Sequence, residues 1–265
     1  MSTTTQARVI TEVNDGVATI TLANVEARNA IDVPFAEEIR EHVDEAAARD
    51  DVGALLVRAD GRAWCVGGAL DVFSESGDGI HDYITAIGRA FIPLVTTLHE
   101  CSKITIAAVH GAVGGGGIGL MLAHDIVIAA EGTVMALGYS KIGTNPDGGS
   151  SHFLVRDIGY RRALELYVRN ERIDAAQALE LGMINRVVAR DELEAEAAAY
   201  AAAVAAGPWR AQGATKRLLR QAQAGLLARQ LDDEFRMFAD HTREPDFAEG
   251  VRAFLEKREP RFGAA

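Results

Sequence analysis

The stretch His110-Gly-Ala-Val-Gly-Gly-Gly-Gly-Ile-Gly119 decides how this sequence folds, because it joins an apolar run to a short helical segment. The preceding residues 104–109 (ITIAAV) have the composition of a buried strand. The residues that follow, up to His124, are typical of a short helix and include no Lys or Arg. A glycine-rich turn before a helix leaves the first backbone N–H groups accessible. The stretch therefore predicts a site for an anion, or for the negative oxygen of a reacting carbonyl group.

Gly114, Gly116 and Gly119 also satisfy the GxGxxG pattern of dinucleotide-binding folds. That pattern opens a βαβ unit and has an acidic residue about 20 residues later. Here a long segment precedes it, position 139 is Tyr, and the GK[ST] ending of a phosphate-binding loop is missing. The sequence therefore disfavours a nucleotide-binding fold. A purely structural role, in which the glycines only allow tight packing of the turn, stays open.

A second glycine-rich turn, Trp64-Cys-Val-Gly-Gly-Ala-Leu70, follows the apolar run 54–58, which reads as another buried strand. Two such turns, each after a buried strand, could supply two converging N–H donors. A pair of donors of this kind suits the enolate of a thioester.

The remaining elements extend from these two turns. Residues 9–13 and 17–22 read as strands around an Asn14-Asp15-Gly16 hairpin turn. Asp32 precedes a helix with apolar residues at a four-residue spacing. Further expected elements are a helix at 83–98, which Pro93 bends or restarts, a strand at 126–130, and helices at 174–182, 191–206, 211–228, 231–241 and 246–257. The pattern predicts an α/β fold with a strand-rich part at 1–190 and a helical part at 191–265.

The composition excludes several classes of protein. The chain has 265 residues with 27 Lys and Arg against 38 Asp and Glu, a formal net charge of −11. This balance disfavours general nucleic-acid binding, which depends on Lys and Arg neutralising phosphates. No apolar run reaches the length of about 18 residues that a membrane span needs.

The cysteines and histidines indicate neither a disulfide bond nor a metal site. Cys65 and Cys101 form no CxxC motif, and the first residues lack the pattern of a secretory leader. A cytoplasmic protein with reduced thiols is therefore expected. The seven histidines show no metal-ligand spacing, so we expect no metal.

Several segments together resemble the crotonase superfamily of enoyl-CoA hydratases and isomerases over nearly the whole chain. The matching pieces are 27–31 (ARNAI), 64–68 (WCVGG), 106–117 (IAAVHGAVGGGG), Asp125, 142–149 (IGTNPDGG) and 249–258 (EGVRAFLEKR). The resemblance implies a spiral of ββα units, a C-terminal helical trimerisation region, and assembly as a homotrimer or a dimer of trimers. It implies an acyl-CoA thioester as substrate, and no cofactor beyond the coenzyme A of that substrate.

The resemblance also assigns the site. The oxyanion-hole amides are those of Gly68 and Gly116. Contacts with the substrate and its coenzyme A are implied for Arg28, Ala30, Val66, Gly67, Ala69, Leu70, Gly115, Tyr139, Phe238 and Lys257. From the residues alone, exposed charge or plain core packing is an equally good explanation for Arg28, Phe238 and Lys257. His110 and His152 are candidates for the lining of the acyl pocket, and Asp125 reads as structural.

The sequence departs from the hydratases of this superfamily at the acids. Hydratases carry two glutamates that activate water, and the matching positions here are Gly119 and Tyr139. Ala69 stands where an acid usually follows the first glycine turn. Water addition by the usual pair of carboxylates is therefore not expected.

One carboxylate remains at a matching position, Asp147. The pattern of the ring-1,2-epoxyphenylacetyl-CoA isomerases is the most similar, through 91–95 (FIPLV), 139–143 (YSKIG), 146–148 (PDG) and 257–262 (KREPRF). The alternative is structural, because Asn145-Pro-Asp-Gly148 is a strong type I turn signal. We predict Asp147 to be the acid–base catalyst, with Gly68 and Gly116 stabilising the enolate.

The sequence thus predicts an acyl-CoA isomerase that shifts a double bond or rearranges a ring beside the thioester. Three alternatives stay open: an enoyl-CoA hydratase with an atypical base, a C–C hydrolase of the same superfamily, and a CoA-binding scaffold without catalytic activity.

Overall fold

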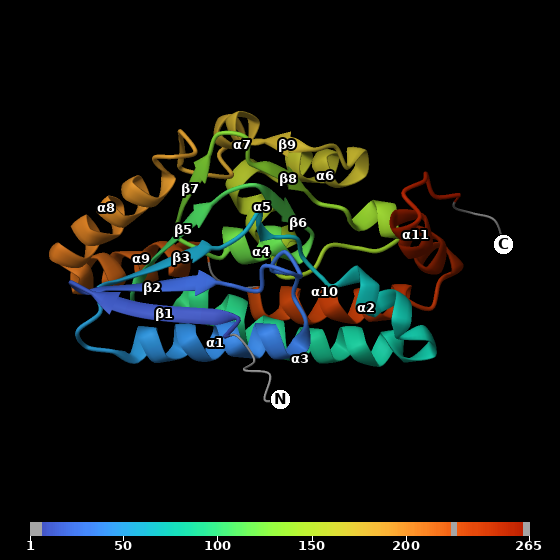
Figure 1. The fold of residues 1–265 in the computed structure, drawn as a ribbon, viewed down its shortest axis with the longest axis horizontal. Coiled ribbons are helices and arrows are strands. Elements are labelled where there is room, and N and C mark those ends of the chain that lie inside the picture. Colours follow the sequence, from blue (N-terminus) through green and yellow to red (C-terminus); the bar gives the residue numbers. More distant parts are fainter. Residues whose placement is uncertain (1–6, 224–226, 262–265) are drawn as a thin grey trace, which may run out of the picture.

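Two β-sheets form the frame of the protein, and strands that follow one another in the chain belong alternately to one sheet and the other (Figure 1). The computed structural model describes residues 7–223 and 227–261. The larger sheet has the order β1 (Val9–Asn14), β2 (Val17–Leu22), β3 (Ala54–Ala59), β5 (Ile104–Val109), β7 (Ile126–Ala130), β10 (Arg186–Val188). The smaller sheet has the order β4 (Ala63–Cys65), β6 (Ala112–Gly114), β8 (Val134–Ala136), β9 (Ile173–Asp174).

Each turn of the spiral contributes one strand to each sheet. β3, β5 and β7 pair in parallel in the larger sheet, and the strands that follow them, β4, β6 and β8, pair in parallel in the smaller one. This alternation is the predicted spiral of ββα units. Only the β1–β2 hairpin and the β8–β9 pair are antiparallel among the described strands.

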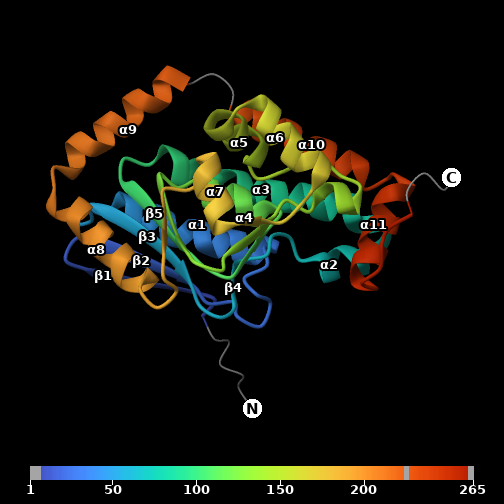
Figure 2. The same ribbon diagram turned by 90° about the horizontal axis from the view of Figure 1, so that it is seen from above.

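Helices cover both faces of the larger sheet. The chain forms α1 (Val33–Ala48), α2 (Leu70–Glu75), α3 (Ile80–Glu100), α4 (Gly116–Leu122), α5 (Ser150–Ile158), α6 (Tyr160–Arg169), α7 (Ala175–Leu181), α8 (Leu193–Ala206), α9 (Trp209–Gln223), α10 (Leu227–His241) and α11 (Pro245–Leu255), with 3₁₀ turns η1 (Gly77–Gly79) and η2 (Tyr139–Ile142). α1 and α10 both pack on α3, while α8 packs on β3, β5 and β7. Figures 1 and 2 place α8 and α9 at one end of the molecule and α11 at the other.

Local signals explain several of these elements. The side chain of Asp32 accepts a hydrogen bond from the Phe35 amide at 2.6 Å, so it caps α1 as predicted. Asp174 and Gln177 form a capping box at the start of α7. In the alanine-rich α8, Ala197 and Ala201 are fully buried against the larger sheet, because their small side chains allow the helix to approach it closely.

Two expectations need correction. In addition, the sequence did not indicate β9 and β10, which add an edge strand to each sheet. α3 begins at Ile80 and continues through Pro93 without interruption. A proline inside a helix costs about 3 kcal/mol, which the burial of the apolar face of α3 against α1 and α10 outweighs. The helix expected at 211–228 begins at Trp209 and is described only to Gln223, and its last expected turn falls partly on 224–226, outside the described residues.

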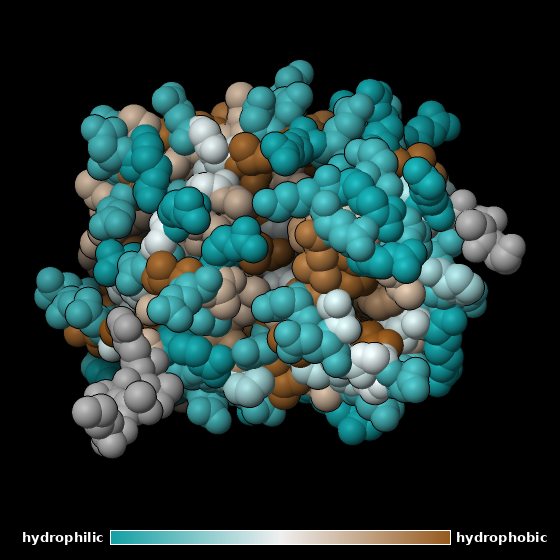
Figure 3. All heavy atoms as spheres, turned by 45° about the vertical axis from the view of Figure 1, so that its right-hand side comes forward, coloured by the Kyte–Doolittle hydropathy of each residue, from teal (hydrophilic) through white to brown (hydrophobic). Residues whose placement is uncertain are grey.

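The face of the protein drawn in Figure 3 is mainly hydrophilic. On the face in Figure 3, teal side chains predominate and apolar atoms gather in a recess near the centre. No helix in the described part of the chain is long and apolar enough to cross a membrane.

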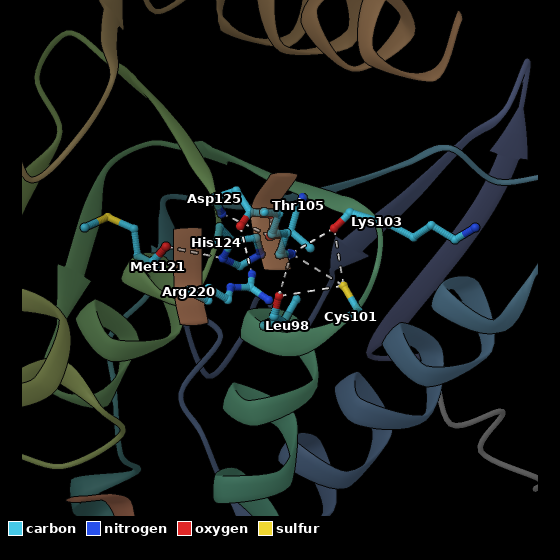
Figure 4. A network of polar contacts seen from close by, with 9 residues as sticks. Leu98, Cys101, Lys103, Thr105, Met121, His124, Asp125 and Arg220 are labelled. Carbon is cyan, nitrogen blue, oxygen red and sulfur yellow. Dashed lines mark hydrogen bonds and ion pairs between the residues drawn. The ribbon is translucent and has the colours of Figure 1, made fainter. Parts of the chain in front are cut away.

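Asp125 joins α9 to the larger sheet (Figure 4). Its Oδ2 accepts hydrogen bonds from the backbone N–H and hydroxyl of Thr105 at 2.8 and 3.0 Å, and lies 2.6 Å from Nζ of Lys216. Its Oδ1 lies 2.9 Å from Nη2 of Arg220. The Lys216 ammonium is buried and also donates to the backbone oxygen of Lys103 at 2.8 Å. The expectation that Asp125 is structural agrees with these contacts.

Replacing Asp125 with Ala should lower the free energy of unfolding by about 3–5 kcal/mol, because it leaves the Lys216 ammonium buried without its counter-charge. Urea denaturation at pH 7 measures the change. The matched control is Glu194→Ala, which removes an exposed ion pair to Arg58 and should cost at most about 1 kcal/mol. Equal losses in the two variants would contradict the assigned role of Asp125.

Candidate active site

The candidate site lies where three neighbouring strands of the smaller sheet end. Gly68 follows β4, Gly116 follows β6, and the segment that carries Asp147 follows β8. These strands are parallel neighbours, and the carboxyl ends of parallel strands share one edge of a sheet. The topology therefore brings together three predicted catalytic residues that are far apart in sequence.

The two glycine turns contact each other through their backbones. A Cβ on Gly67 would lie 2.5 Å from the carbonyl oxygen of Gly114 and 3.1 Å from the amide nitrogen of Gly116. Gly67 also has a φ of +84°, which favours glycine. Among the hydrogen bonds of the described residues, neither the Gly68 amide nor the Gly116 amide has an acceptor. Both predicted oxyanion donors are therefore available to a ligand.

Asp147 lies against the second of these turns. A Cβ on Gly116 would be 3.1 Å from Oδ1 of Asp147, and the Asp147 side chain is buried. Burial raises the pKa of the carboxyl to about 6, and the hydrogen bond from Tyr139 opposes this increase. The group therefore gains and loses a proton close to neutral pH, which suits an acid–base catalyst.

Tyr139 is a partner of Asp147. Its hydroxyl donates to Oδ1 of Asp147 at 2.8 Å. Burial and the Asp147 carboxylate raise the pKa of Tyr139 well above its ordinary value, so the phenol stays protonated as a donor. The sequence indicated Tyr139 as a substrate contact and did not indicate this hydrogen bond. The substrate contact stays a prediction.

The turn at Asp147 differs from the type I turn that its sequence favours. The i to i+3 hydrogen bond runs from the Ser150 amide to the Asp147 carbonyl oxygen at 3.1 Å. Gly148 and Gly149 both have positive φ, of 61° and 80°. The turn therefore comprises residues 147–150, with Asp147 at its first position, because only the two glycines adopt these angles without strain.

Glu234 is a site residue that the sequence did not reveal. From α10, its Oε2 accepts a hydrogen bond from the Gly149 amide at 2.7 Å, and its Oε1 accepts one from the Ser151 hydroxyl. The contact spans 85 residues of sequence, so no local pattern signals it. α10 thus holds the turn that carries Asp147.

The structure leaves no room for the first hydratase carboxylate. A Cβ on Gly119 would lie 2.2 Å from the carbonyl oxygen of Gly148. Real Cβ contacts are not this short, so the 147–150 turn occupies the space that a side chain at 119 needs. Ala69, which stands where an acid usually follows the first glycine turn, precedes α2 and is buried.

The segments assigned to coenzyme A lie beside the first glycine turn. The Ile31 amide donates to Gly67 at 2.7 Å, and the Ala69 amide donates to Ile31 at 3.3 Å, so the strand-like segment from Ala30 runs along that turn. Arg28 lies in the turn just before, and Leu70 begins α2. The other members of this set, Val66 and Gly115, are parts of the two glycine turns. The structure thus clusters these residues, and their contact with coenzyme A stays a prediction.

The two C-terminal members of the set differ in exposure. Phe238 is buried and packs edge-to-face on Phe73, whose ring lies against Gly68. Lys257 is exposed just after α11, which packs on α2. Phe238 thus packs behind the first glycine turn, and a contact of either residue with coenzyme A stays a prediction.

Two histidines make contacts elsewhere. Nε2 of His110 lies 3.0 Å from the carbonyl oxygen of Gly61, and the ring of His152 packs on His99 and Phe153. Neither contact involves Asp147. A cavity of ≈ 610 Å³ lies beside the Asp125 cluster, and Asp147, Gly68 and Gly116 are not among its lining residues. In the described ranges, no three His, Cys, Asp or Glu side chains are grouped so that they could hold a metal ion.

A spiral of ββα units with strands in two sheets is the crotonase fold, shared with the solved enoyl-CoA hydratases to which the chain is similar. Residues 12–265 match the family model described as enoyl-CoA hydratase/isomerase, and the chain belongs to this family.

Known relatives extend over almost the whole chain. A probable enoyl-CoA hydratase of Rhodobacter capsulatus is 34% identical over 254 residues, covering 95% of this chain and 96% of that protein. A 1,2-epoxyphenylacetyl-CoA isomerase of Escherichia coli is 33% identical over 255 residues, covering 96% and 97%. The crystal structure of an enoyl-CoA hydratase from Bacillus halodurans matches with a TM-score of 0.87 at 25% identity, covering 93% of this chain and 100% of that chain.

Proposed function

We propose that the protein is an acyl-CoA isomerase that moves a double bond, or rearranges a ring, next to the thioester. The observation that carries this proposal is the position of Asp147, a buried carboxyl group beside the Gly116 amide. At the two positions where hydratases carry glutamates, this chain has Tyr139, which donates a hydrogen bond to Asp147, and Gly119, where the backbone of the 147–150 turn fills the space of a side chain. One acid–base group serves an isomerisation, whereas hydration also needs a positioned water.

The reaction consists of two proton transfers on one face of the substrate. The Asp147 carboxylate takes a proton from C2 of a 3-enoyl thioester, and the C–H electron pair forms a dienolate. The amides of Gly68 and Gly116 donate hydrogen bonds to the thioester oxygen as its negative charge develops, a contribution of about 3 kcal/mol for each donor. The protonated Asp147 then returns the proton to C4, giving the 2-enoyl thioester. No atom is gained or lost, and the proposal includes no cofactor.

The second candidate is an enoyl-CoA hydratase with an atypical base. It is favoured by the relative from Rhodobacter capsulatus, which is described as a probable enoyl-CoA hydratase.

Bond migration and water addition separate the candidates. With a 3-enoyl-CoA substrate, the isomerase should give the 2-enoyl product, followed by the absorbance of the conjugated thioester. NMR in D₂O should show deuterium at C4 wherever the carboxyl proton exchanges with solvent before its return. With crotonyl-CoA, a hydratase should instead give the 3-hydroxyacyl product, and rapid water addition without bond migration would support this second candidate. Binding of acyl-CoA without bond migration, water addition or exchange would refute both and favour a scaffold.

We also propose that the protein assembles as a homotrimer or a dimer of trimers in the cytoplasm. Tyr160, Leu164 and Val168 form an exposed apolar row on α6, with Tyr160 65% and Val168 70% exposed, which is compatible with an interface.

A further inference from the structure

Glu234 is a buried carboxyl group whose two oxygens each accept a hydrogen bond from the Asp147 turn or the helix that follows it. Its side chain is 3% exposed. One oxygen accepts from the Gly149 amide at 2.7 Å, and the other accepts from the hydroxyl of Ser151. The Ser151 oxygen in turn accepts from Nε2 of Gln230, one helical turn earlier on α10, at 2.6 Å. A buried carboxylate is retained at a position such as this only when its partners are fixed.

The backbone of Glu234 holds the other side of the same loop. Its carbonyl oxygen accepts from Nδ2 of Asn145 at 3.0 Å, and Oδ1 of Asn145 lies 2.9 Å from Nδ1 of His241. Asn145 and Gly149 are the residues two before and two after Asp147. The catalytic carboxyl therefore lies between two points that are both fixed to α10.

α10 itself is fixed to the helix behind the site. The ring of Phe235 packs edge-to-face on Phe91 of α3, with centroids 6.4 Å apart. The Phe91 ring contacts the site in turn, because Cβ atoms on Gly116 and Gly148 would lie 3.5 and 2.6 Å from its Cε1. α10 therefore contacts the catalytic turn in two ways: through the packing of Phe235 on Phe91, and through the hydrogen bonds of Glu234.

The Asp147 charge also acts on Glu234. The titratable groups that face it are Asp147, from the 147–150 turn, and Tyr167, from α6. Burial raises the pKa of Glu234 to about 7, its hydrogen bonds from Ser151 and Gly149 lower it, and the Asp147 charge raises it. Two like charges in one buried site oppose each other's ionisation.

We propose that Glu234 is a positioning residue of the active site: its carboxyl group holds the Gly149 amide and so keeps Asp147 against Gly116. This inference rests on the proposed function, in which Asp147 transfers the proton.

Two substitutions separate the charge of Glu234 from its hydrogen bond with the Gly149 amide, the tether of the turn. Glu234→Gln keeps an acceptor for the Gly149 amide and removes the charge. Its kcat should stay within about threefold of the wild type, because the amide oxygen can still accept the hydrogen bond from Gly149. Glu234→Ala removes the acceptor, so the turn loses its position. Its kcat should fall about tenfold to a hundredfold while KM changes less than about threefold.

The matched control is Asp233→Asn, which removes the neighbouring charge on α10. Asp233 is 42% exposed and paired with Arg236, so its loss should leave kcat unchanged. A role in stability alone would lower the melting temperature of the Glu234 variants without changing kcat.

A readout without turnover distinguishes this inference from the proposed function. In the substrate-free protein, the ¹H–¹⁵N resonance of the Gly149 amide should stay near its wild-type position in Glu234→Gln and move in Glu234→Ala, because only the Ala variant removes its acceptor. An unmoved Gly149 resonance and an unchanged kcat in Glu234→Ala would overturn the role of Glu234. If the wild type shows no turnover of acyl-CoA but the resonance moves in Glu234→Ala, the proposed function fails and the tether from Glu234 to the turn stands.

Discussion

Replacing Asp147 with Asn should lower kcat by about two to four orders of magnitude while the protein stays folded. Asn has the shape of Asp, and its Oδ1 can still accept the hydrogen bond from the Tyr139 hydroxyl. It cannot take a proton from C2 of the substrate, so both proton transfers lose their carrier. The measurements are kcat for a 3-enoyl-CoA, the rate of deuterium incorporation in D₂O, and the circular dichroism spectrum.

The matched control for this change is Asp174→Asn. Asp174 caps α7 and accepts from the Gln177 amide at 2.8 Å, and Asn serves equally well at such a position. Its turnover should remain within about twofold of the wild type. Near-normal turnover in Asp147→Asn would show that another group carries the proton.

The same substitution should make the protein more stable at neutral pH. The ordinary pKa of an aspartate is 3.8 and that of Asp147 is about 6, so the folded state favours the protonated carboxyl. As pH rises from about 4 to 6, the folded wild type must ionise a buried group, and stability is lost through this interval. Above pH 6 the variant should be more stable by about 1–3 kcal/mol. Urea denaturation from pH 5 to 8 should show this difference growing to about pH 6 and then levelling.

Replacing Gly119 with Ala should lower both stability and turnover, because the added methyl group meets the backbone of the catalytic turn. The new Cβ would lie 2.2 Å from the oxygen and 2.8 Å from the carbon of the Gly148 carbonyl group. Overpacking of this kind costs typically about 1–3 kcal/mol. The 147–150 turn must shift, and a displacement of about 1 Å at a reacting group costs about a hundredfold in rate. Thermal unfolding and kcat measure the two effects.

Gly79→Ala is the control for adding a methyl group to a glycine. Gly79 has a φ of −82°, and a methyl group there would have open space around it, with no neighbouring atom within 4 Å. This variant should keep its stability within about 0.5 kcal/mol and its full turnover. A Gly119→Ala protein that behaves like Gly79→Ala would mean that position 119 has room for a side chain, and that a hydratase glutamate is excluded there for some other reason.

The sequence predicted the parts of the site that lie within local patterns. The glycine turns at 67–68 and 114–117 were recognisable because glycine is required where two backbones touch, and Asp147 stood at a position that the superfamily resemblance marks. The short strands β4, β6 and β8 were missed, because three residues are too few to show alternation. Their pairing is nevertheless what brings the three predicted catalytic residues together.

The contacts of Tyr139 and Glu234 could not be predicted in this way. Tyr139 reaches Asp147 across a turn whose φ angles the sequence did not specify, since the Asn-Pro-Asp-Gly signal favoured a different register. Glu234 lies in a helix with many acidic residues, and only the packing of α10 on α3 selects it from the others. Burial and partners across long sequence separations, rather than residue type, distinguish these two side chains.

The alternation of successive strands between the two sheets has a consequence for how activity appears during folding. Its parallel pairs close long loops, as when Ala54 pairs with Ile104, and contacts of this kind form slowly. Gly68, Gly116 and Asp147 come from successive turns of the spiral, and Glu234 comes from a helix near the end of the chain. A chain in which only the early turns of the spiral are folded would therefore have part of the core but no complete site. Recovery of catalysis after refolding should report that these turns and α10 are all in place.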